Sequence, residues 1–352
     1  MDATGASTLQ VRRFVRFWED QQLSRARRAH VAASRFERRC GTTAAANRPP
    51  AMPQPPPASD KALYGGKKCP EATRVPDVPA GTFHEHKAWG CSVIYPGTLR
   101  DFDVWLPDTS PSHAGEELGV IVVADGMAAW RFATNIEIVL SNLIHQRKIP
   151  RVALVLCGVG YEPNTGAEAM PPKALFPQSM AGMVQRMREL DVVSEEFGEH
   201  IEAELLPFIA RHHGITFSKD PAKRVMCGQS SGGIAALSAA WHRPDRFGKV
   251  IGISTSFCNS LPGYMLPQEV RLTSPNKPLR IYLSVGEHDV VAENGDWCEH
   301  TLMMGKALAF KGYDYRCEVA EGGGHTLRYT GTKLGEILTW VFGTSDVAPS
   351  RL

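Results

Sequence analysis

The stretch Val225-Met-Cys-Gly-Gln-Ser-Ser-Gly-Gly-Ile-Ala-Ala-Leu237 carries the strongest structural signal in the chain. A short apolar run ends at Cys227 and small, helix-forming residues begin at Gly233, so the pattern predicts a strand followed directly by a helix. Between them lies a Gly-x-Ser-x-Gly motif centred on Ser230. Glycines two positions before and after the serine leave room for a strained turn that exposes its hydroxyl. The sequence therefore predicts Ser230 as a nucleophile on a strand-to-helix turn.

Further apolar runs on both sides of this motif predict a mostly parallel sheet. Continuous runs of this kind suit strands that are buried on both faces. The predicted strands are Val120–Val123, Val152–Leu156, Arg224–Cys227, Val250–Ser254, Ile281–Val285 and Tyr315–Ala320. Predicted helices end near Ile144, run through Phe197–Phe208, begin at Gly233, cover Leu302–Phe310 and end near Phe342. An antiparallel pair, Ser92–Tyr95 with Phe102–Trp105, is expected at one edge of the sheet. Alternating strands and helices predict a doubly wound α/β fold with helices on both faces.

The first 75 residues differ from the rest in composition. Up to Cys40 there are nine arginines, no lysine and four acids, a net charge of +5, whereas the whole chain carries only +2. Spacing predicts an amphipathic basic helix with four apolar residues on one stripe: Val11, Phe14, Val15 and Trp18. It suits a targeting sequence, a surface helix that binds membrane or partner, or an extension without a separate role. We expect a poorly ordered extension over 1–75, including a proline-rich spacer at 49–57, then a catalytic domain over 76–345 and a tail over 346–352.

Charge and composition exclude several classes of protein. Beyond Cys40 the chain carries about −3, which gives no reason to expect nucleic acid as a partner. No apolar run approaches the roughly 18 to 20 residues that a membrane-spanning helix needs, so we expect a soluble protein. Cys157 and Cys227 fall in predicted strands, which favours free core cysteines over a disulfide framework. Compartment and oligomeric state stay open.

An activated serine needs a base and an acid, which this fold places after later strands in the order Ser, acid, His. Glu321-Gly-Gly-Gly-His325 follows the last predicted strand, so His325 is the predicted base. Ser284-Val-Gly-Glu-His-Asp289 ends the strand before it, and Asp289 would accept the Nδ1 proton of His325. Four other carboxylates in or near that loop remain alternatives for the acid: Glu287, Glu293, Asp296 and Glu299.

Tetrahedral intermediates also need amide donors aimed at the oxyanion. In this fold they come from the residue after the nucleophile, here Ser231, and from the loop after an earlier strand. Val120–Ala124 ends in Asp-Gly-Met127, so the second predicted donor is the amide of Met127, with an ordinary β-turn as the alternative. We expect Trp130 and Trp297 to line the substrate pocket and the proline-containing loop Tyr161–Ala181 to wall it.

Two histidines raise the question of a metal. His84 and His86 are two positions apart, so on a strand they would share one face. Imidazoles suit metal ions, but no further ligand stands at suitable spacing nearby. We therefore predict no metal site, and serine chemistry requires no organic cofactor.

These motifs resemble the enterochelin-esterase-like branch of the family called "Putative esterase", which also contains the antigen 85 mycolyltransferases and feruloyl esterase domains. The matching stretches are Pro96-Gly-Thr98 with Arg100, Ala124-Asp-Gly126, Cys227–Ile234, Arg243–Val250, Gly312–Tyr315 and Gly322–His325. The resemblance covers about residues 81 to 343. The resemblance implies the α/β-hydrolase fold, Ser230 and His325 as catalytic residues, and Met127 as an oxyanion donor.

The sequence departs from the relatives in one place and leaves the acid open in another. Leu190 stands in a segment where relatives of this branch usually have a Tyr. In the mycolyltransferases the acid is a Glu somewhat later in the chain, which keeps Glu299 as an alternative to Asp289.

Together these observations predict a serine carboxylester hydrolase that acts on a small-molecule ester through an acyl-enzyme. An acyltransferase that uses the same triad is the first alternative, because pocket shape and water exclusion decide whether water or an alcohol resolves the intermediate. A catalytically inactive binding module that retains the fold is the second.

Overall fold

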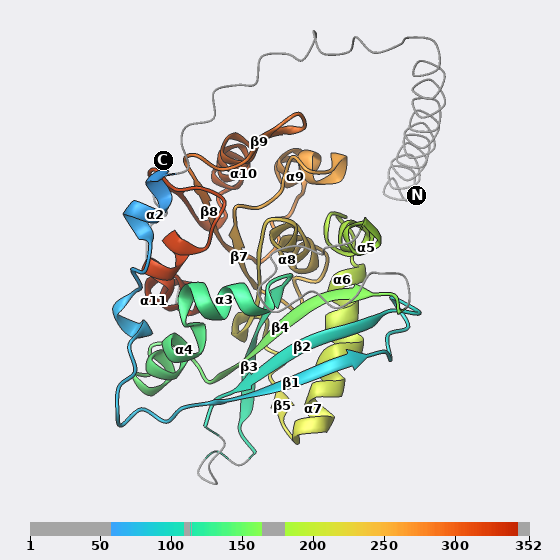
Figure 1. The fold of residues 1–352 in the computed structure, drawn as a ribbon. Coiled ribbons are helices and arrows are strands. Elements are labelled where there is room, and N and C mark those ends of the chain that lie inside the picture. Colours follow the sequence, from blue (N-terminus) through green and yellow to red (C-terminus); the bar gives the residue numbers. More distant parts are fainter. Residues whose placement is uncertain (1–57, 109–112, 114, 164–179, 344–352) are drawn as a thin grey trace, which may run out of the picture. The chain divides into compact units, whose positions relative to one another are not determined.

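The computed structural model describes residues 58–108, 113, 115–163 and 180–343, and its core is one large sheet (Figure 1). The sheet has nine strands in the order β1-β2-β4-β3-β6-β7-β8-β11, with β5 paired to the start of β3. β1, β2 and β4 pair antiparallel, and the other pairs are parallel. The strands are β1 (Thr82–Trp89), β2 (Leu99–Leu106), β3 (Glu117–Ala124), β4 (Val152–Tyr161), β5 (Thr216–Phe217), β6 (Arg224–Gln229), β7 (Lys249–Ile253), β8 (Arg280–Gly286) and β11 (Asp314–Ala320). A separate short hairpin joins β9 (Val291–Ala292) to β10 (Gly295–Asp296).

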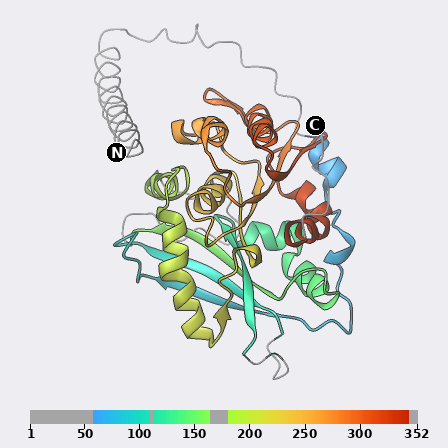
Figure 2. The same ribbon diagram turned by 180° about the vertical axis from the view of Figure 1, so that it is seen from behind.

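Helices cover both faces of the sheet (Figures 1 and 2). One face carries α5 (Met180–Leu190), α6 (Glu196–Glu199), the π-helical turn η3 (His200–Leu205), α7 (Leu206–His213), α8 (Ser231–His242), α9 (Leu261–Leu272) and α10 (Trp297–Lys311). The other carries α3 (Met127–Thr134), α4 (Ile136–His145) and α11 (Arg328–Phe342). Strand β3 shows why two cores form: Val120 and Val122 point to the first layer, and Ile121 and Val123 to the second. This alternation is the two-residue period of a strand buried on both sides.

The predicted fold class is confirmed, since the sheet is mostly parallel and the helices lie on both of its faces. Each of the six apolar runs predicted as parallel strands forms one, with ends that differ by a few residues. Cys157 and Cys227 are buried in β4 and β6, and the cysteines in the described ranges are free.

One predicted strand is wrong. Residues Ser92–Tyr95 form a loop, and β2 pairs instead with β1, whose polar sequence gave a weak strand signal. The carboxylate of Glu204 explains the loop, because it accepts hydrogen bonds from the amides of Val93 and Ile94 at 2.8 and 3.0 Å. Backbone donors that a side chain satisfies in this way are not available to a neighbouring strand.

Part of the predicted N-terminal extension packs on the sheet layer that holds α11. Residues 58–75 include α2 (Ala58–Tyr64) and the short turn η1 (Pro70–Ala72), and Cys69 and Ala72 are buried in that core. The side-chain amide of Asn142 donates to the carbonyls of Glu71 and Thr73 at 2.7 and 2.8 Å. The predicted basic helix and proline-rich spacer lie outside the described residues, so the domain boundaries stay a prediction. Within the described ranges, no helix has the length and apolar character that crossing a membrane requires.

Candidate active site

Ser230 occupies the turn between β6 and α8, where its backbone is strained. Its φ of 58° lies in the left-handed region that residues other than glycine rarely adopt. Such strain costs of order 1–3 kcal/mol and persists only where the surroundings fix it. Here the amide of Ser230 donates to the carbonyl of Ile253 at 2.9 Å, and the carbonyl of Ser230 accepts from the amide of Ser256 at 3.1 Å. The neighbouring strand β7 thus helps to hold the turn in place.

The two glycines of the motif are required by close backbone contacts. A Cβ at Gly228 would lie 2.1 Å from the carbonyl oxygen of Gly232. A Cβ at Gly232 would lie 2.3 Å from the carbonyl oxygen of Ala124, at the end of β3. Any side chain at either position would push the start of α8 away from the sheet. The Gly-x-Ser-x-Gly pattern therefore brings Ser230 close to the loop that follows β3.

The structure pairs His325 with Asp289, as the sequence predicts. The Nδ1 atom of His325 lies 2.5 Å from the Oδ1 atom of Asp289, and the Asp289 side chain has no exposed surface. A carboxylate can only accept a hydrogen bond, so Nδ1 carries the proton and Nε2 presents its lone pair. The Oδ2 atom of Asp289 accepts from the hydroxyl of Ser254 at 2.5 Å. Asp289 thus links His325 to Ser254.

The environment of Asp289 keeps it ionised. Burial alone would raise the pKa of this carboxyl, but the hydrogen bonds from His325 and Ser254 outweigh burial and lower the pKa below its ordinary value. The amide of Val290 adds a further donor at 2.7 Å. A buried carboxylate stabilised by several donors is suited to hold an imidazolium that forms beside it.

The four alternative acids have other surroundings. Glu287 accepts from the amide of Gly322, and Asp296 caps α10 by accepting from the amides of Cys298 and Glu299. Glu293 and the side chain of Glu299 lie on the exposed surface. Of the five candidates, Asp289 has the direct contact with His325.

A short chain of contacts joins Ser230 to His325. The Ser230 hydroxyl lies 3.0 Å from the hydroxyl of Ser256, which also accepts a hydrogen bond from the indole Nε1 of Trp297 at 3.1 Å. The Trp297 ring meets the His325 ring edge to face, with centroids 6.3 Å apart. Among the described residues, the Ser230 hydroxyl bonds Ser256 and not His325. A rotation about one side-chain bond of Ser230 would redirect its hydroxyl.

The loops that carry the acid and the base are bonded to each other. The amide of His288 donates to the carbonyl of Gly323 at 2.7 Å, and the amide of Gly322 donates to the Glu287 carboxylate at 2.8 Å. A Cβ at Gly286 would lie 2.5 Å from the carbonyl oxygen of Gly323, so the two backbones touch. The loops after β8 and β11 therefore form one unit.

The predicted oxyanion donors stand at two helix starts. Met127 is the first residue of α3 and Ser231 the first residue of α8. Asp125, between β3 and α3, has a φ of 54°, which turns the chain sharply before Met127. The close approach of Gly232 to Ala124 brings these two helix starts together. Amides at a helix start point outward without an intrahelical partner, which suits an anionic oxygen.

Arg186 on α5 bridges these two segments. Its Nε donates to the carboxylate of Asp125 at 2.7 Å, and another guanidinium nitrogen donates to the Ser231 hydroxyl at 2.9 Å. Both members of the ion pair are nearly fully buried. Sequence reasoning missed Arg186, and it also missed Ser254 and Ser256. The two serines had a signal, since they directly follow a buried strand, at the edge where the predicted catalytic residues gather.

The two tryptophans differ in their surroundings. Trp297 lies beside His325, as described above. Trp130 is only 1% exposed and packs in the core beneath Gly126, so it offers a substrate almost no surface. We therefore leave Trp130 out of the proposed site. Most of the loop Tyr161–Ala181 lies outside the described residues.

Comparison with known proteins assigns this chain to a family. The family described as "Putative esterase" matches residues 95–341. The iron(III) enterobactin esterase of Dickeya dadantii is 33% identical over 207 residues, which cover 54% of this chain and 45% of the relative. An uncharacterized Bacillus subtilis protein, YbbA, is 25% identical over 75% of this chain and 97% of its own length. The chain thus spans about half the length of the enterobactin esterases that it matches.

A solved structure supports the fold. The enterobactin esterase of Shigella flexneri superposes with a TM-score of 0.54 and 22% identity, over 76% of this chain and 61% of that one. The matched residues 95–341 include β2 to β4, the strained turn at Ser230 and the loop of His325. The chain therefore belongs to the family described as "Putative esterase", resembles its enterobactin esterases, and is a carboxylic ester hydrolase.

Proposed function

We propose that this chain hydrolyses its ester through an acyl-enzyme, with Ser230 as nucleophile, His325 as base and Asp289 as the acid that orients it. The observation that carries the proposal is the 2.5 Å contact between His325 and a fully buried Asp289, close to a serine with a φ of 58°. Strained backbone at a polar cluster is typical of catalytic sites, where the surrounding structure fixes the reactive group.

In the proposed reaction the Ser230 hydroxyl turns from Ser256 toward His325. Its oxygen attacks the ester carbonyl while Nε2 of His325 takes its proton, and Asp289 stabilises the imidazolium that results. The imidazolium then gives the proton to the leaving alcohol, which frees the alcohol and leaves the acyl group on Ser230. Water, activated by His325, attacks the acyl-enzyme, releases the acid and restores the serine.

The amides of Met127 and Ser231 would hold the negative oxygen of each tetrahedral intermediate. Each amide of this kind is worth roughly 10²- to 10³-fold in kcat when it is aimed where the charge develops. The Arg186 bridge between Asp125 and Ser231 would keep the two donors at a fixed separation. We assign Arg186 as a positioning residue, because it bonds Asp125 and Ser231 in the two loops.

The names of two relatives support a substrate class. These relatives are esterases of iron(III) enterobactin and iron(III) salmochelin. We propose a small-molecule carboxylic ester as substrate, and Trp297 as a wall of its pocket near His325. A panel of aryl and alkyl esters that includes enterobactin and a feruloyl ester would identify the acyl and alcohol parts. Substrate preference that is unchanged in Trp297→Ala across this panel would remove Trp297 from the pocket.

The test of the mechanism is a serine-directed fluorophosphonate probe, read by intact-mass spectrometry and peptide mapping. We expect one adduct on Ser230 in the wild type and none in Ser230→Ala, together with loss of ester hydrolysis by roughly 10⁴-fold or more. Ser260→Ala is the matched control, since Ser260 caps α9 by accepting from the amide of Gly263. Labelling that survives in Ser230→Ala would exclude Ser230. A wild type that neither labels nor hydrolyses would indicate an inactive binding module, and product that forms only with an added alcohol would indicate an acyltransferase.

A further inference from the structure

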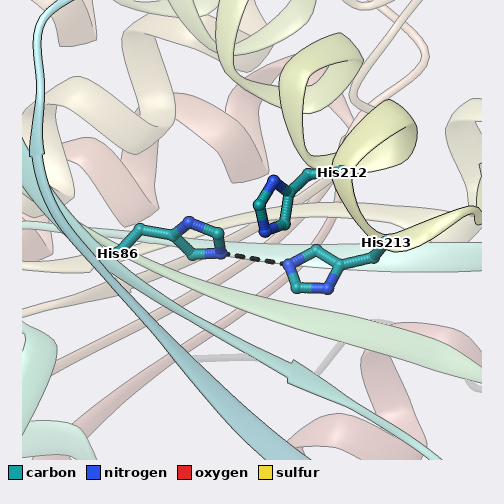
Figure 3. A group of neighbouring side chains, drawn as sticks. All are labelled: His86, His212 and His213. Atoms are coloured by element: carbon teal, nitrogen blue, oxygen red, sulfur yellow. Dashed lines mark hydrogen bonds between the residues drawn. The ribbon is translucent and has the colours of Figure 1, made fainter.

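Three histidines from two distant segments meet at the outer strand of the sheet (Figure 3). His86 lies on β1, and His212 and His213 are the last two residues of α7. One ligand nitrogen from each lies within 4.8 Å of the others. The cluster is separate from the catalytic loops, because β2, β4 and β3 lie between β1 and β6 in the sheet.

The spacing of these nitrogens is close to that of a metal site. The Nε2 atoms of His86 and His213 are 3.0 Å apart and point at each other in Figure 3. A tetrahedral zinc ion with Zn–N distances of about 2.1 Å holds neighbouring nitrogens roughly 3.4 Å apart. Small side-chain movements would therefore admit an ion. A fourth imidazole, that of His84, lies against His213 with ring centroids 4.6 Å apart.

The surroundings fix the rings and favour a cation. His86 stacks on Phe102 at 4.5 Å between ring centroids, and His212 stacks on Phe208 at 5.6 Å. The aligned peptide dipoles of α7 give its C-terminal end a partial negative charge, which attracts positive ions.

We propose that His86, His212 and His213 form a binding site for a divalent transition metal of the zinc type, with His84 or water as the fourth ligand. Imidazole nitrogens without carboxylates or thiolates suit Zn²⁺, Cu²⁺ and Ni²⁺ better than Mg²⁺ or Ca²⁺. The bound ion would fasten the edge strand β1 to α7. Sequence spacing could not reveal the site, because 127 positions separate His86 from His213.

The experiment uses the untagged full chain, stripped with EDTA and titrated with Zn²⁺ in a calorimeter. We expect one Zn²⁺ per chain that depends on the cluster. His212→Gln should weaken binding by more than about tenfold, because even second-shell changes cost a metal site 10- to 100-fold. His212 is exposed, so this change should leave the fold intact. His145→Gln, at an exposed histidine at the end of α4, is the matched control and should bind like the wild type.

Thermal unfolding supplies an independent readout. At 100 times its dissociation constant, Zn²⁺ should raise the melting temperature of the wild type by roughly 5 °C and that of His212→Gln by much less. The two proteins should melt alike in EDTA, which shows that the variant is folded. Absence of Zn²⁺ binding in the wild type, or binding as tight as the wild type's in both His212→Gln and His86→Gln, would overturn the proposal. The result does not depend on ester hydrolysis.

Discussion

Two groups of histidines, at different places on one sheet, show how the neighbour of an imidazole determines its chemistry. His325 meets the carboxylate of Asp289 where the parallel strands end. His86, on the antiparallel edge strand β1, contacts the imidazole of His213, which comes from α7. A carboxylate fixes the proton on one ring nitrogen and stabilises positive charge, which suits proton transfer. Neighbouring imidazoles present several ring nitrogens to one point, which suits metal binding.

The largest expected effect is the removal of the carboxylate from the first group. Asp289→Asn keeps the shape of the side chain but can donate to Nδ1, which favours the wrong tautomer of His325. By analogy with the chymotrypsin triad, we expect kcat for ester hydrolysis to fall by roughly 10³- to 10⁴-fold. Steady-state hydrolysis of an aryl ester measures this.

Glu287→Gln is the matched control, since it changes an acid of the same loop that contacts Gly322 and not His325. We expect kcat for this variant to stay near the wild-type value. A larger loss in Glu287→Gln than in Asp289→Asn would contradict the assignment and break the contrast between the two histidine groups.

The second prediction concerns the buried guanidinium of Arg186, which bonds Asp125 and Ser231. Arg186→Met leaves Asp125 buried without its partner and removes the bond to Ser231. Because a shift of about 1 Å in the oxyanion loops can cost 10²-fold, we expect kcat to fall by roughly that factor while KM changes much less. Arg186→Lys should recover part of the loss.

The control is Arg188→Met, at an exposed position on the same helix. It should retain wild-type kcat and KM. If Arg186→Met lowers the melting temperature but leaves kcat unchanged, Arg186 has a structural role only.

The third prediction uses the pH dependence of stability. Since the pKa of Asp289 is lowered in the folded protein, its ionised form stabilises the fold. This contribution is present above the ordinary carboxyl pKa of about 4 and is lost as the pH falls through the lower folded-state pKa. The free energy of unfolding, measured by urea denaturation, should therefore fall more steeply below about pH 4 in the wild type than in Asp289→Asn. Parallel curves for the two proteins would show that the pair with His325 does not favour ionisation.

The smallest expected effect is that of EDTA on ester hydrolysis, and it tests whether the two histidine groups act independently. EDTA should leave ester hydrolysis unchanged, because the proposed metal ligands do not touch the catalytic loops, while it lowers the melting temperature of the zinc-loaded protein. Initial rates and melting curves from one preparation test both statements. A large loss of kcat in EDTA that Zn²⁺ restores would mean that the two sites are coupled.

The sequence predicts strands correctly where apolar residues follow one another without interruption. The run Val120–Val123 predicts a strand buried on both faces, because no polar residue interrupts it, and the structure places its alternate residues in two cores. The polar strand β1 lacks such a run and was missed. Ser92–Tyr95 has the residue types of a strand, but Glu204 binds its amides from a distant segment, and no local pattern contains that information.

In the candidate site, too, some residues could be predicted from the order of strands and others depend on tertiary contacts. Ser230, Asp289 and His325 follow three predicted strands, so their loops were expected to meet at one edge of the sheet. Arg186 comes from a helix that also contains Arg188, and only the tertiary contacts with Asp125 and Ser231 single it out. The histidine cluster likewise depends on the packing of α7 against β1, which spacing along the chain does not encode.

The bonded loops after β8 and β11 have a consequence for engineering. Because Gly286 touches Gly323 and the amide of His288 binds the same residue, a loop graft that replaces one segment would displace the partner segment as well. Both segments would have to be exchanged together to keep His325 in contact with Asp289. Changes intended to alter selectivity are therefore better directed at other loops, where insertions leave these two bonded segments unchanged.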